Sequence, residues 1–294
     1  ASNFRKGEGK YLVIEADEWN KSFWHYRSQV AVVTNIDKEH LDTYKSFRGV
    51  VAGFTRYFKN VPKGGALILN WRDAELRKFG AKSGKSRNVV FYNKSSFKKH
   101  PLLILGRHNQ INAEAALTAA KLLGAKKDDA DYVFKTFSGA WRRLEKLASS
   151  NQGLEIRNWK LEIYSDYAHH PTEIRATLQA LREKHPKEQL ICVFQPHHQD
   201  RLTKLFKEFT GAFKQADVAV VLPVYKVKGR DEVYRGKDSF ALAQAVGERQ
   251  KNVFYAENLE SAMKTVKNFL TRDAVIVFMS AGDLDSQVRR FIST

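Results

Sequence analysis

The chain has 294 residues, enough for two domains of ordinary size, and 43% of them are hydrophobic, as in typical globular proteins. No apolar run approaches the roughly 20 residues that span a bilayer, and the opening ASNFRKGEGK has no apolar signal core. We therefore expect a cytoplasmic protein with no membrane partner. The single cysteine, Cys192, lies in the apolar run LICVF and cannot form an internal disulfide, which fits a reducing compartment.

The charge balance is strongly basic. Fifty Lys and Arg residues stand against 32 Asp and Glu residues, a net charge of +18. Such an excess attracts anions, including nucleic acid and phosphorylated small molecules. The basic residues are scattered, which favours a solvated basic surface. A noncatalytic, basic nucleic-acid-binding α/β protein is the alternative, and its binding would fall steeply with salt.

In chain order, four apolar segments of the first half predict strands: KYLVIEA (10–16), QVAVVTNI (29–36), ALILN (66–70) and NVVFYN (88–93). A helix is predicted over 109–124, with Gly124 as its C-cap. The segment GAKSGKS (80–86) lacks the glycine spacing of a phosphate loop and is interpreted as an ordinary basic loop.

In the second half, apolar runs alternate with amphipathic segments. The predicted strands are LEIYSD (161–166), QLICVF (189–194), DVAVVLPV (217–224), NVFYA (252–256) and AVIVFMSA (274–281). The predicted helices are 171–185, 201–213, 239–249, 258–270 and 283–292. This alternation indicates right-handed βαβ units and a parallel, Rossmann-like sheet. The polar segment ASSNQG is the predicted boundary, which gives domains 1–147 and 148–294, both of α/β class.

Polar side chains crowd two loops that follow strands of the second domain. They are Asp166, Tyr167, His169 and His170 in the first loop, and Gln195, His197, His198 and Arg201 in the second. The carboxyl ends of parallel strands are where open α/β sheets bind ligands. The four histidines lack the ligand spacing of a zinc site, so zinc is not favoured.

The first half offers candidates for metal and nucleotide binding. The acidic and imidazole groups at two strand ends are Glu15, Asp17 and Glu18, followed by Asn35, Asp37, Glu39, His40 and Asp42. On neighbouring strands they could hold a divalent cation, or they are simply solvated. The groups that open the helix near 109 are His108, Asn109 and Asn112, which either read an adenine edge or cap the helix. Arg142 and Arg143 suit a phosphate or a surface ion pair.

Seven segments, in this order, resemble the Mur ligases: EADE, VVTNIDKEHLDTY, GRHNQINAEAA, FSGAWRRLE, SDYAHHPTEI, FQPH and SAGDLD. The matches run from residue 15 to residue 285 and so cover essentially the whole chain. The resemblance implies an incomplete central ATPase domain with a largely parallel sheet, followed by a C-terminal Rossmann-like ligase domain. It is strongest to the branch that uses ATP and Mg²⁺ to join L-alanine to UDP-N-acetylmuramate through an acyl phosphate, in peptidoglycan synthesis.

The resemblance also implies residue roles, residue by residue. Glu15 and His40 match magnesium ligands; His108, Asn109 and Asn112 match the adenine-binding motif; Arg143 matches an arginine that faces the ATP phosphates, and Asp166 the carboxylate that holds the ribose. Tyr167, His169 and His198 fall on substrate-binding positions, and His170, His197 and Arg201 on catalytic ones.

The chain departs from the family pattern in three places. The phosphate loop and the N-terminal domain that binds the uridine nucleotide are absent upstream of Ala1, so this later two thirds of a ligase is expected to be inactive alone. Glu39 stands where the family usually has Asp. After FQPH, His198-Gln199-Asp200 replaces the usual Arg-Tyr-Thr. The phrases FWHYRS and WRRLE also resemble the branch that recycles whole peptides onto UDP-N-acetylmuramate, which is an alternative, as is a noncatalytic regulatory or assembly fragment.

Overall fold

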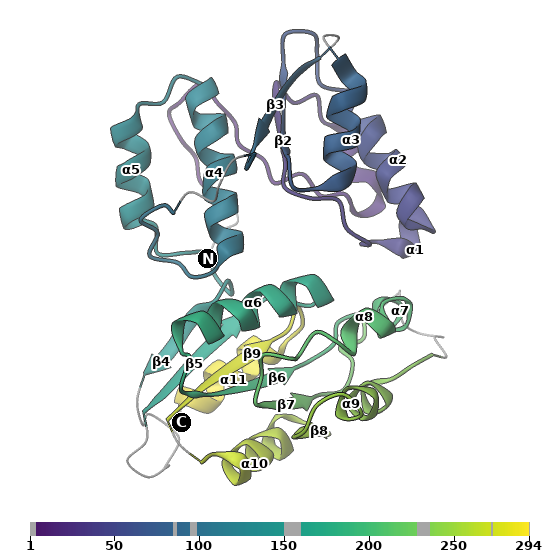
Figure 1. Ribbon diagram of the computed structural model, residues 1–294, viewed down its shortest axis with the longest axis vertical. Helices are drawn as coiled ribbons and strands as arrows, with labels where there is room; N and C mark the ends of the chain where they lie inside the picture. Colours follow the sequence, from purple (N-terminus) through teal and green to yellow (C-terminus); the bar gives the residue numbers. More distant parts are fainter. Residues whose placement is uncertain are drawn as a thin grey trace. The chain divides into compact units, whose positions relative to one another are not determined.

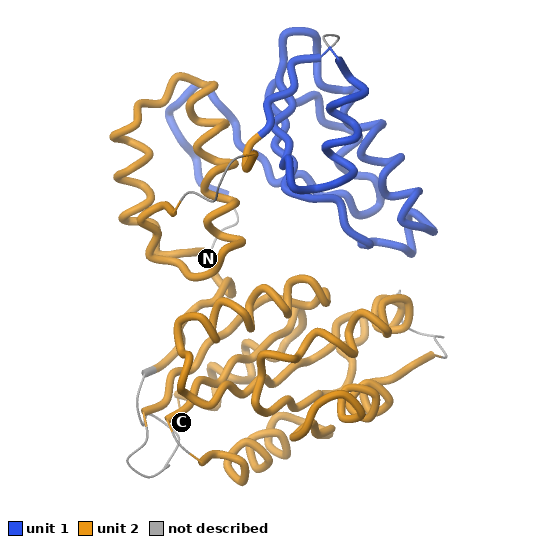
Figure 2. Tube along the Cα trace, viewed as in Figure 1, with its two compact units in different colours: residues 1–91 blue, residues 92–294 orange. Residues whose placement is uncertain are grey.

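The computed structural model describes residues 4–84, 87–94, 99–149, 160–227, 236–271 and 273–293 (Figure 1). The chain divides into two compact units, Ala1–Phe91 and Tyr92–Thr294 (Figure 2). Helices and mostly parallel strands make up both units, so the predicted α/β class is confirmed.

The first unit contains a three-stranded sheet. Its elements are η1 (Trp19–His25), β1 (Val30–Val33), α1 (Leu41–Tyr44), α2 (Phe47–Phe58), β2 (Ala66–Asn70), α3 (Ala74–Ser83) and β3 (Asn88–Tyr92). The strand order is β1-β2-β3, and β1 and β2 are parallel, with Val30 opposite Ala66. Aromatic rings form much of the core beside this sheet, where Phe23 contacts Phe54 and Tyr57. The first four residues of GAKSGKS end α3, and the two that follow Gly84 lie outside the described residues.

The strand predicted over 10–16 is not formed. Residues 11–18 have no regular structure, and Leu12 and Val13 are 76% and 92% exposed. A strand requires a neighbour to pair its backbone N–H and C=O groups. No strand of the described residues pairs with this segment, so its apolar composition alone did not produce a strand.

The second unit begins with a helical pair, α4 (Arg107–Leu122) and α5 (Lys127–Thr136). The helix predicted near 109–124 is confirmed, and Gly124 ends it in the left-handed region at φ 86°. Gly106 precedes α4 at φ 94°, and a Cβ there would lie 2.9 Å from the Cβ of Ala180. Glycine therefore permits both the backbone conformation and the close approach of α4 to α6 (Pro171–Lys184).

A six-stranded sheet follows in the order β4-β5-β9-β6-β7-β8. Its strands are β4 (Glu145–Ser149), β5 (Leu161–Asp166), β6 (Gln189–Phe194), β7 (Val218–Val221), β8 (Val253–Tyr255) and β9 (Ala274–Met279). The five predicted strands are present and parallel, whereas β4 is an antiparallel edge strand that was not predicted. The boundary predicted after residue 147 falls inside β4, and the division into domains 1–147 and 148–294 stays a prediction.

Helices cover both faces of this sheet (Figure 1). The remaining helices are α7 (Gln199–Lys204), α8 (Phe206–Phe209), α9 (Ser239–Gly247), α10 (Leu259–Phe269) and α11 (Leu284–Ser293). On one face Ile163 and Ile191 pack with residues of α10 and α11, such as Val266 and Val288. On the other face Phe194 contacts Phe209, at 5.8 Å between ring centroids. The helix predicted over 201–213 is divided into α7 and α8 at Leu205, whose ψ of 18° is not helical.

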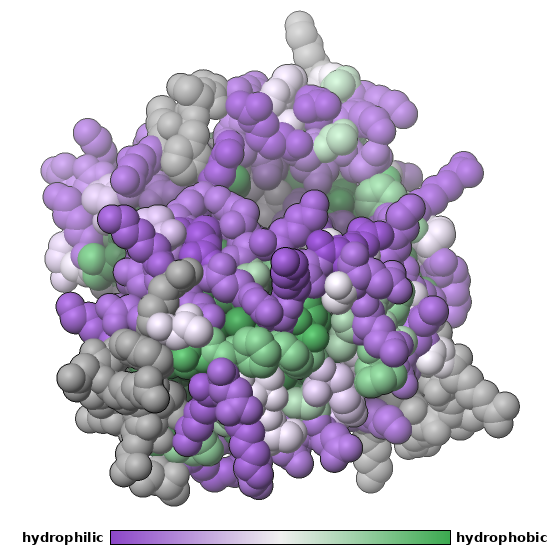
Figure 3. All heavy atoms as spheres, turned by 60° about the horizontal axis from the view of Figure 1, so that its bottom comes forward, coloured by the Kyte–Doolittle hydropathy of each residue, from purple (hydrophilic) through white to green (hydrophobic). Residues whose placement is uncertain are grey.

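The surface matches the polar composition. The face drawn in Figure 3 is mostly hydrophilic, with a hydrophobic area in its lower middle. Within the described ranges, no helix combines the length and the apolar character that crossing a bilayer requires.

Candidate functional site at the carboxyl edge of the C-terminal sheet

Three loops meet at the carboxyl edge of the sheet because β9 lies between β5 and β6. The backbone N–H of Ser280, after β9, donates to the carbonyl of Asp166 at the end of β5, at 3.1 Å. The N–H of Gln195, after β6, donates to the carbonyl of Met279 at 3.0 Å. The two polar loops predicted from the sequence are therefore brought together around the end of β9.

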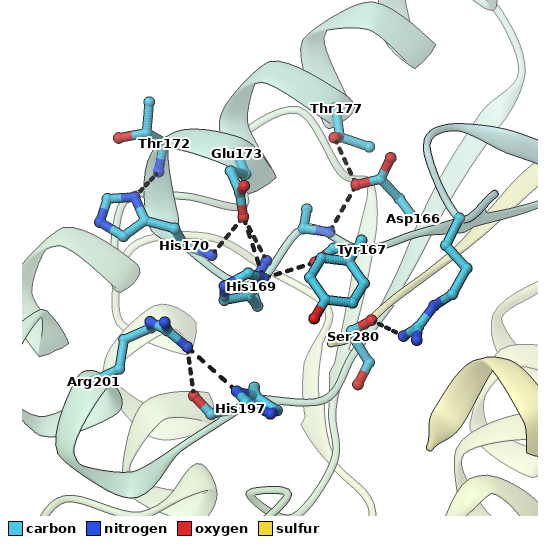
Figure 4. Close-up of polar contacts among 12 residues, drawn as sticks. Asp166, Tyr167, His169, His170, Thr172, Glu173, Thr177, His197, Arg201 and Ser280 are labelled. Atoms are coloured by element: carbon cyan, nitrogen blue, oxygen red, sulfur yellow. Dashed lines mark hydrogen bonds and ion pairs between the residues drawn. The ribbon is translucent and has the colours of Figure 1, made fainter. Parts of the chain in front are cut away.

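Asp166 anchors the first loop. It is 5% exposed; Oδ2 accepts from Leu144 N at 2.7 Å, and Oδ1 accepts from Ala168 N at 2.8 Å and from the Thr177 hydroxyl at 3.2 Å (Figure 4). Burial raises the pKa of this carboxyl to about 6, although the backbone hydrogen bonds act in the opposite direction. Three of its roughly four acceptor positions are thus used within the protein. The predicted contact with a ribose stays a prediction.

The start of α6 is fixed by a capping box. The His170 ring accepts from Thr172 N at 3.3 Å, while Glu173 Oε2 accepts from the N–H groups of His169 and His170 at 3.0 and 3.2 Å (Figure 4). His170, predicted to be catalytic, is 7% exposed and acts here as the N-cap. Its hydrogen bond caps the start of α6, and its catalytic role stays a prediction.

A row of aromatic rings crosses between the two loops. The His169 ring meets Tyr167 at 5.2 Å and His197 at 5.8 Å between centroids, edge to face in each case. His197 in turn stacks on Tyr225, at 5.6 Å and 9° between the ring planes. Tyr225 follows β7, and its N–H donates to the carbonyl of Pro196 at 2.7 Å. Three predicted site residues are therefore assembled, together with one that sequence reasoning missed.

Glycine 282 makes room for Tyr225. A Cβ at this position would lie 2.5 Å from Tyr225 Cγ and 2.9 Å from Gln195 Oε1. Gln195 itself accepts from the hydroxyl of Ser280 at 2.6 Å. The loop that follows β9 thus packs directly against the Tyr225 ring of the aromatic row.

Arg201 and His198 differ in their access to solvent. Arg201 is half-buried on α7, and its guanidinium lies 3.4 Å from His197 Nδ1 and donates to the His197 carbonyl at 3.2 Å (Figure 4). His198 is 4% exposed and has a left-handed backbone, at φ 71°. The structure therefore brings Arg201 into contact with the row at His197, whereas His198 is buried. The substrate contact of His198 stays a prediction.

The adjacent arginines Arg142 and Arg143 have different environments. The Arg142 guanidinium is buried; it donates to the carbonyls of Ser280 and Gly282 and lies 4.8 Å from the Tyr167 ring centroid. The side chain of Arg143 is 49% exposed and lies 3.8 Å from Glu173 Oε1. Only Arg143 can turn toward a bound anion without breaking buried hydrogen bonds.

The predicted adenine-binding residues lie at the start of α4. Burial lowers the pKa of His108, and the charge of Arg143 lowers it further, while Glu173 raises it. His108 therefore shares an electrostatic environment with the C-terminal loops. The amide of Asn109 donates to the carbonyl of Leu105 at 2.6 Å, and Asn112 is exposed.

The first unit contains a candidate metal group. Asp17, Glu18 and His40 each offer a ligand atom, and these atoms lie within 4.8 Å of one another. His40 Nε2 is 3.5 Å from Glu18 Oε1, while its buried Nδ1 has no hydrogen-bond partner. This donor set fits a divalent cation bound through oxygen and nitrogen. Glu15 is exposed and is not part of the group, so its assignment as a ligand stays a prediction.

Two family models match the chain. The Mur ligase middle domain matches residues 1–102, and the Mur ligase glutamate ligase domain matches residues 142–282. Together they match residues of both units, in the order that the sequence motifs indicate.

Curated relatives extend the match to nearly the whole chain. The chain is 32% identical to a UDP-N-acetylmuramate--L-alanine ligase of Desulforapulum autotrophicum over 96% of its length, and 30% identical to that of Hydrogenobaculum sp. over 100%. It spans 65% and 67% of these relatives, respectively.

Solved structures share the fold. The UDP-N-acetylmuramate-alanine ligase of Thermotoga maritima superposes with a TM-score of 0.66 at 21% identity, covering 92% of this chain and 60% of that one. Folylpolyglutamate synthase of Mycobacterium tuberculosis gives 0.67 at 18%, covering 92% and 65%. The match to both family models and to relatives along the whole sequence shows that this chain belongs to the Mur ligase family.

Proposed function

We propose that this chain supplies the nucleotide and acceptor sites of an ATP-dependent ligase that joins L-alanine to the carboxylate of UDP-N-acetylmuramate, in peptidoglycan synthesis. The names of the curated relatives support this substrate pair. One observation carries the proposal: the carboxyl edge of the sheet places Tyr167, His169, His197 and Arg201 in one cluster.

The reaction has two steps. A carboxylate oxygen attacks the γ-phosphorus of ATP, which releases ADP and forms an acyl phosphate. The amine of L-alanine then attacks the acyl carbon, and phosphate leaves with the bonding electrons while the amine loses a proton. A bound Mg²⁺ would neutralise charge on the transferring phosphoryl group, and Asp17, Glu18 and His40 are the residues that would hold it.

The two arginines suit the two anions of this reaction. Arg143 is half-exposed, lies 3.8 Å from Glu173 Oε1 and 5.3 Å from the Tyr167 ring centroid, and can turn to the ATP phosphates without breaking a buried hydrogen bond. Arg201 is anchored on His197 through one amino group, and its planar fork suits the carboxylate of the amino acid. Asp166 holds the loop between them and has about one acceptor position left for a ribose hydroxyl.

The neighbours of the two histidines define complementary tautomers. His169 Nδ1 lies 2.8 Å from the carbonyl of Tyr167, so this nitrogen donates, and the neutral ring presents Nε2 as an acceptor. His197 Nδ1 faces the Arg201 guanidinium, which can only donate, so its neutral ring carries the proton on Nε2. His169 is thus suited to accept the proton of the attacking amine, and His197 to donate to the oxygen of the tetrahedral intermediate.

Nucleotide binding tests this proposal on the chain itself. We expect ADP to bind in isothermal titration calorimetry, and Arg143→Gln to weaken binding about tenfold, because a charge-assisted hydrogen bond to phosphate is lost. Arg249→Gln removes an exposed arginine two residues after α9 and is the matched control. Equal affinities of the Arg143 and Arg249 variants would contradict the phosphate assignment.

Ligation can be tested in a fusion protein in which the first third of the Hydrogenobaculum relative precedes this chain. We expect phosphate release that requires both UDP-N-acetylmuramate and L-alanine. Arg201→Gln should raise the KM for L-alanine with little change in the KM for ATP. A rise in the KM for ATP alone would contradict the assignment of Arg201.

A further inference from the structure

A pocket of about 480 Å³ lies between the start of α4, the outer face of α6 and the segment 211–215 that follows α8. Of its lining residues, only His108 and Thr172 have been described at the candidate site above. Thr172, at its edge, lies on the side of α6 away from Asp166 and Thr177 (Figure 4). The pocket therefore uses a different face of α6 from the cluster of histidines.

The walls of the pocket are anchored. On one side the guanidinium of Arg182 donates to the carbonyl of Gln215 at 3.0 Å and to Asp217 Oδ2 at 2.8 Å, which holds the segment after α8 against α6. On the other side Gly106 allows α4 to pack directly on Ala180. Arg182 and Gly106 thus hold the two walls of the pocket against α6.

The lining combines an apolar floor with a cationic rim. Ile111, Ala176, Ala180 and Ala212 supply the floor. Arg107, Arg175 and Lys214 are exposed and line the same space, whereas none of the lining residues is an Asp or a Glu. Since no acidic residue lines the pocket, the positive charges of Arg175 and Lys214 favour an anion there.

The start of α4 adds to this field. Arg107 and His108 open the helix, and neither an acidic side chain in the first turn nor a side-chain cap offsets its positive end. A helix start alone would not define a site. Here it borders a half-open pocket that is also lined by three cationic side chains.

We propose that this pocket binds a small organic anion, in which a phosphate or carboxylate group is attached to an apolar body. The head group would lie among Arg107, Arg175 and Lys214, because guanidinium groups bind both anions through parallel hydrogen bonds. The apolar body would cover the alanines of α6. The volume suits a small ligand, which such pockets bury against apolar side chains.

Binding here would influence the candidate site through α4. The ligand would contact α4 and α6 together, and His108, which lines the pocket, is also one of the predicted adenine-binding residues, so this step rests on the proposed function. A ligand that stabilises the packing of α4 on α6 changes nucleotide affinity, and the nucleotide then changes ligand affinity by the same factor. The pocket is therefore a candidate regulatory site.

The test uses phenyl phosphate and phenylacetate as probes on the 294-residue chain, without ATP. Calorimetry should show that at least one probe binds about tenfold more tightly than inorganic phosphate or benzyl alcohol, because only the probes match both rim and floor. The two probes identify the preferred head group. Equal binding of inorganic phosphate would overturn the role of the floor, and equal binding of benzyl alcohol would overturn that of the rim.

Variants locate the probe. Arg175→Gln and Lys214→Gln should each weaken binding roughly three- to tenfold, since both rim charges are partly screened by solvent. Ala176→Phe should abolish binding by filling the floor, whereas Ala176→Ser and the exposed Lys207→Gln should not change it. Binding that survives Ala176→Phe, or that is lost in Arg143→Gln alone, would place the probe elsewhere and overturn the proposal. Because no turnover is measured, this result is independent of the proposed ligase reaction.

Discussion

Two buried carboxylates at the same edge of the sheet should respond to pH in opposite directions. Asp166 and Asp285 are each 5% exposed. Burial raises the pKa of Asp166 to about 6. Burial also acts to raise the pKa of Asp285, but hydrogen bonds from Arg289 and Ser165 outweigh it, and the pKa is lowered. We therefore compare Asp166→Asn with Asp285→Asn, both of which remove a titrating group with little change in volume.

The sign follows from proton linkage. The folded protein binds a proton at Asp166 more tightly than the unfolded chain, so this group contributes stability below its unfolded pKa of about 4, and the contribution is lost as pH rises through about 6. From pH 7 to pH 4, the free energy of unfolding of the wild type should rise by about 2 kcal/mol relative to that of Asp166→Asn, since each unit of pKa difference between the folded and unfolded states is worth about 1.4 kcal/mol. Asp285 contributes stability above the unfolded pKa, which is lost as pH falls through and below about 4.

At neutral pH, Asp166→Asn changes the free energy of unfolding in two opposing ways. In Asp166→Asn one amide N–H₂ group would face a backbone N–H, from either Leu144 or Ala168, and leave that donor unpaired. An unsatisfied donor costs about 1–3 kcal/mol, which offsets the gain from removing a buried charge. The pH dependence of the difference between wild type and variant is therefore more informative than its value at pH 7.

Urea-dependent hydrogen exchange of peptides from β5 and β9 measures the stability of this sheet without assuming that the two compact units unfold together. The difference between wild type and Asp166→Asn should grow as pH falls from 7 to 4. The difference for Asp285→Asn should stay level to about pH 5 and shrink below it. A constant or shrinking difference for Asp166→Asn would refute the reasoning that burial dominates its titration.

Three further predictions concern packing and the metal group. Gly282→Ala should cost roughly 1–3 kcal/mol in urea unfolding, because its Cβ would overlap Tyr225, whereas Gly211→Ala, with no atom within 4 Å, should change little. Arg142→Gln should lower the free energy of unfolding by about 2–4 kcal/mol, because it leaves buried carbonyls unpaired, whereas Arg143→Gln should change it by less than about 0.5 kcal/mol. Equal losses would contradict their different environments. Glu18→Gln should weaken Mn²⁺ binding, measured by electron paramagnetic resonance, roughly tenfold, while Glu15→Gln should leave it unchanged; the reverse result would favour Glu15 as the ligand.

The central strands β6, β7 and β9 could be predicted because each is a short, fully buried apolar run. QLICVF and AVIVFM are buried at every position, as strands covered on both faces must be. β4 reads EKLAS, a mixed and partly polar sequence, and it is a strand because β5 offers an edge for pairing. KYLVI shows the converse, an apolar run that forms no strand. Strand formation at an edge depends on a partner that local sequence does not specify.

The site was predictable to the extent that it follows the strand ends. Tyr167, His169 and His197 lie in loops that directly continue β5 and β6, so the parallel sheet brings them together. Tyr225 also follows a strand, β7, and its position at the carboxyl edge could have indicated it. Its stacking on His197, however, depends on the space left by Gly282, which is distant in sequence. A long-range contact of this kind leaves no local pattern.

The pair Arg142 and Arg143 shows why neighbouring residues of one type can differ in role. Arg142 has a left-handed backbone at φ 56°, and its side chain enters the protein, where the carbonyls of Ser280 and Gly282 are arranged to accept from it. The adjacent N–H of Leu144 is held by Asp166, so the segment cannot rotate to exchange the two side chains. Arg143 is thereby kept at the surface, near Glu173, with a half-exposed guanidinium. The buried arginine positions the exposed one, and the selection is made by backbone carbonyls of β9's loop rather than by the sequence WRRLE.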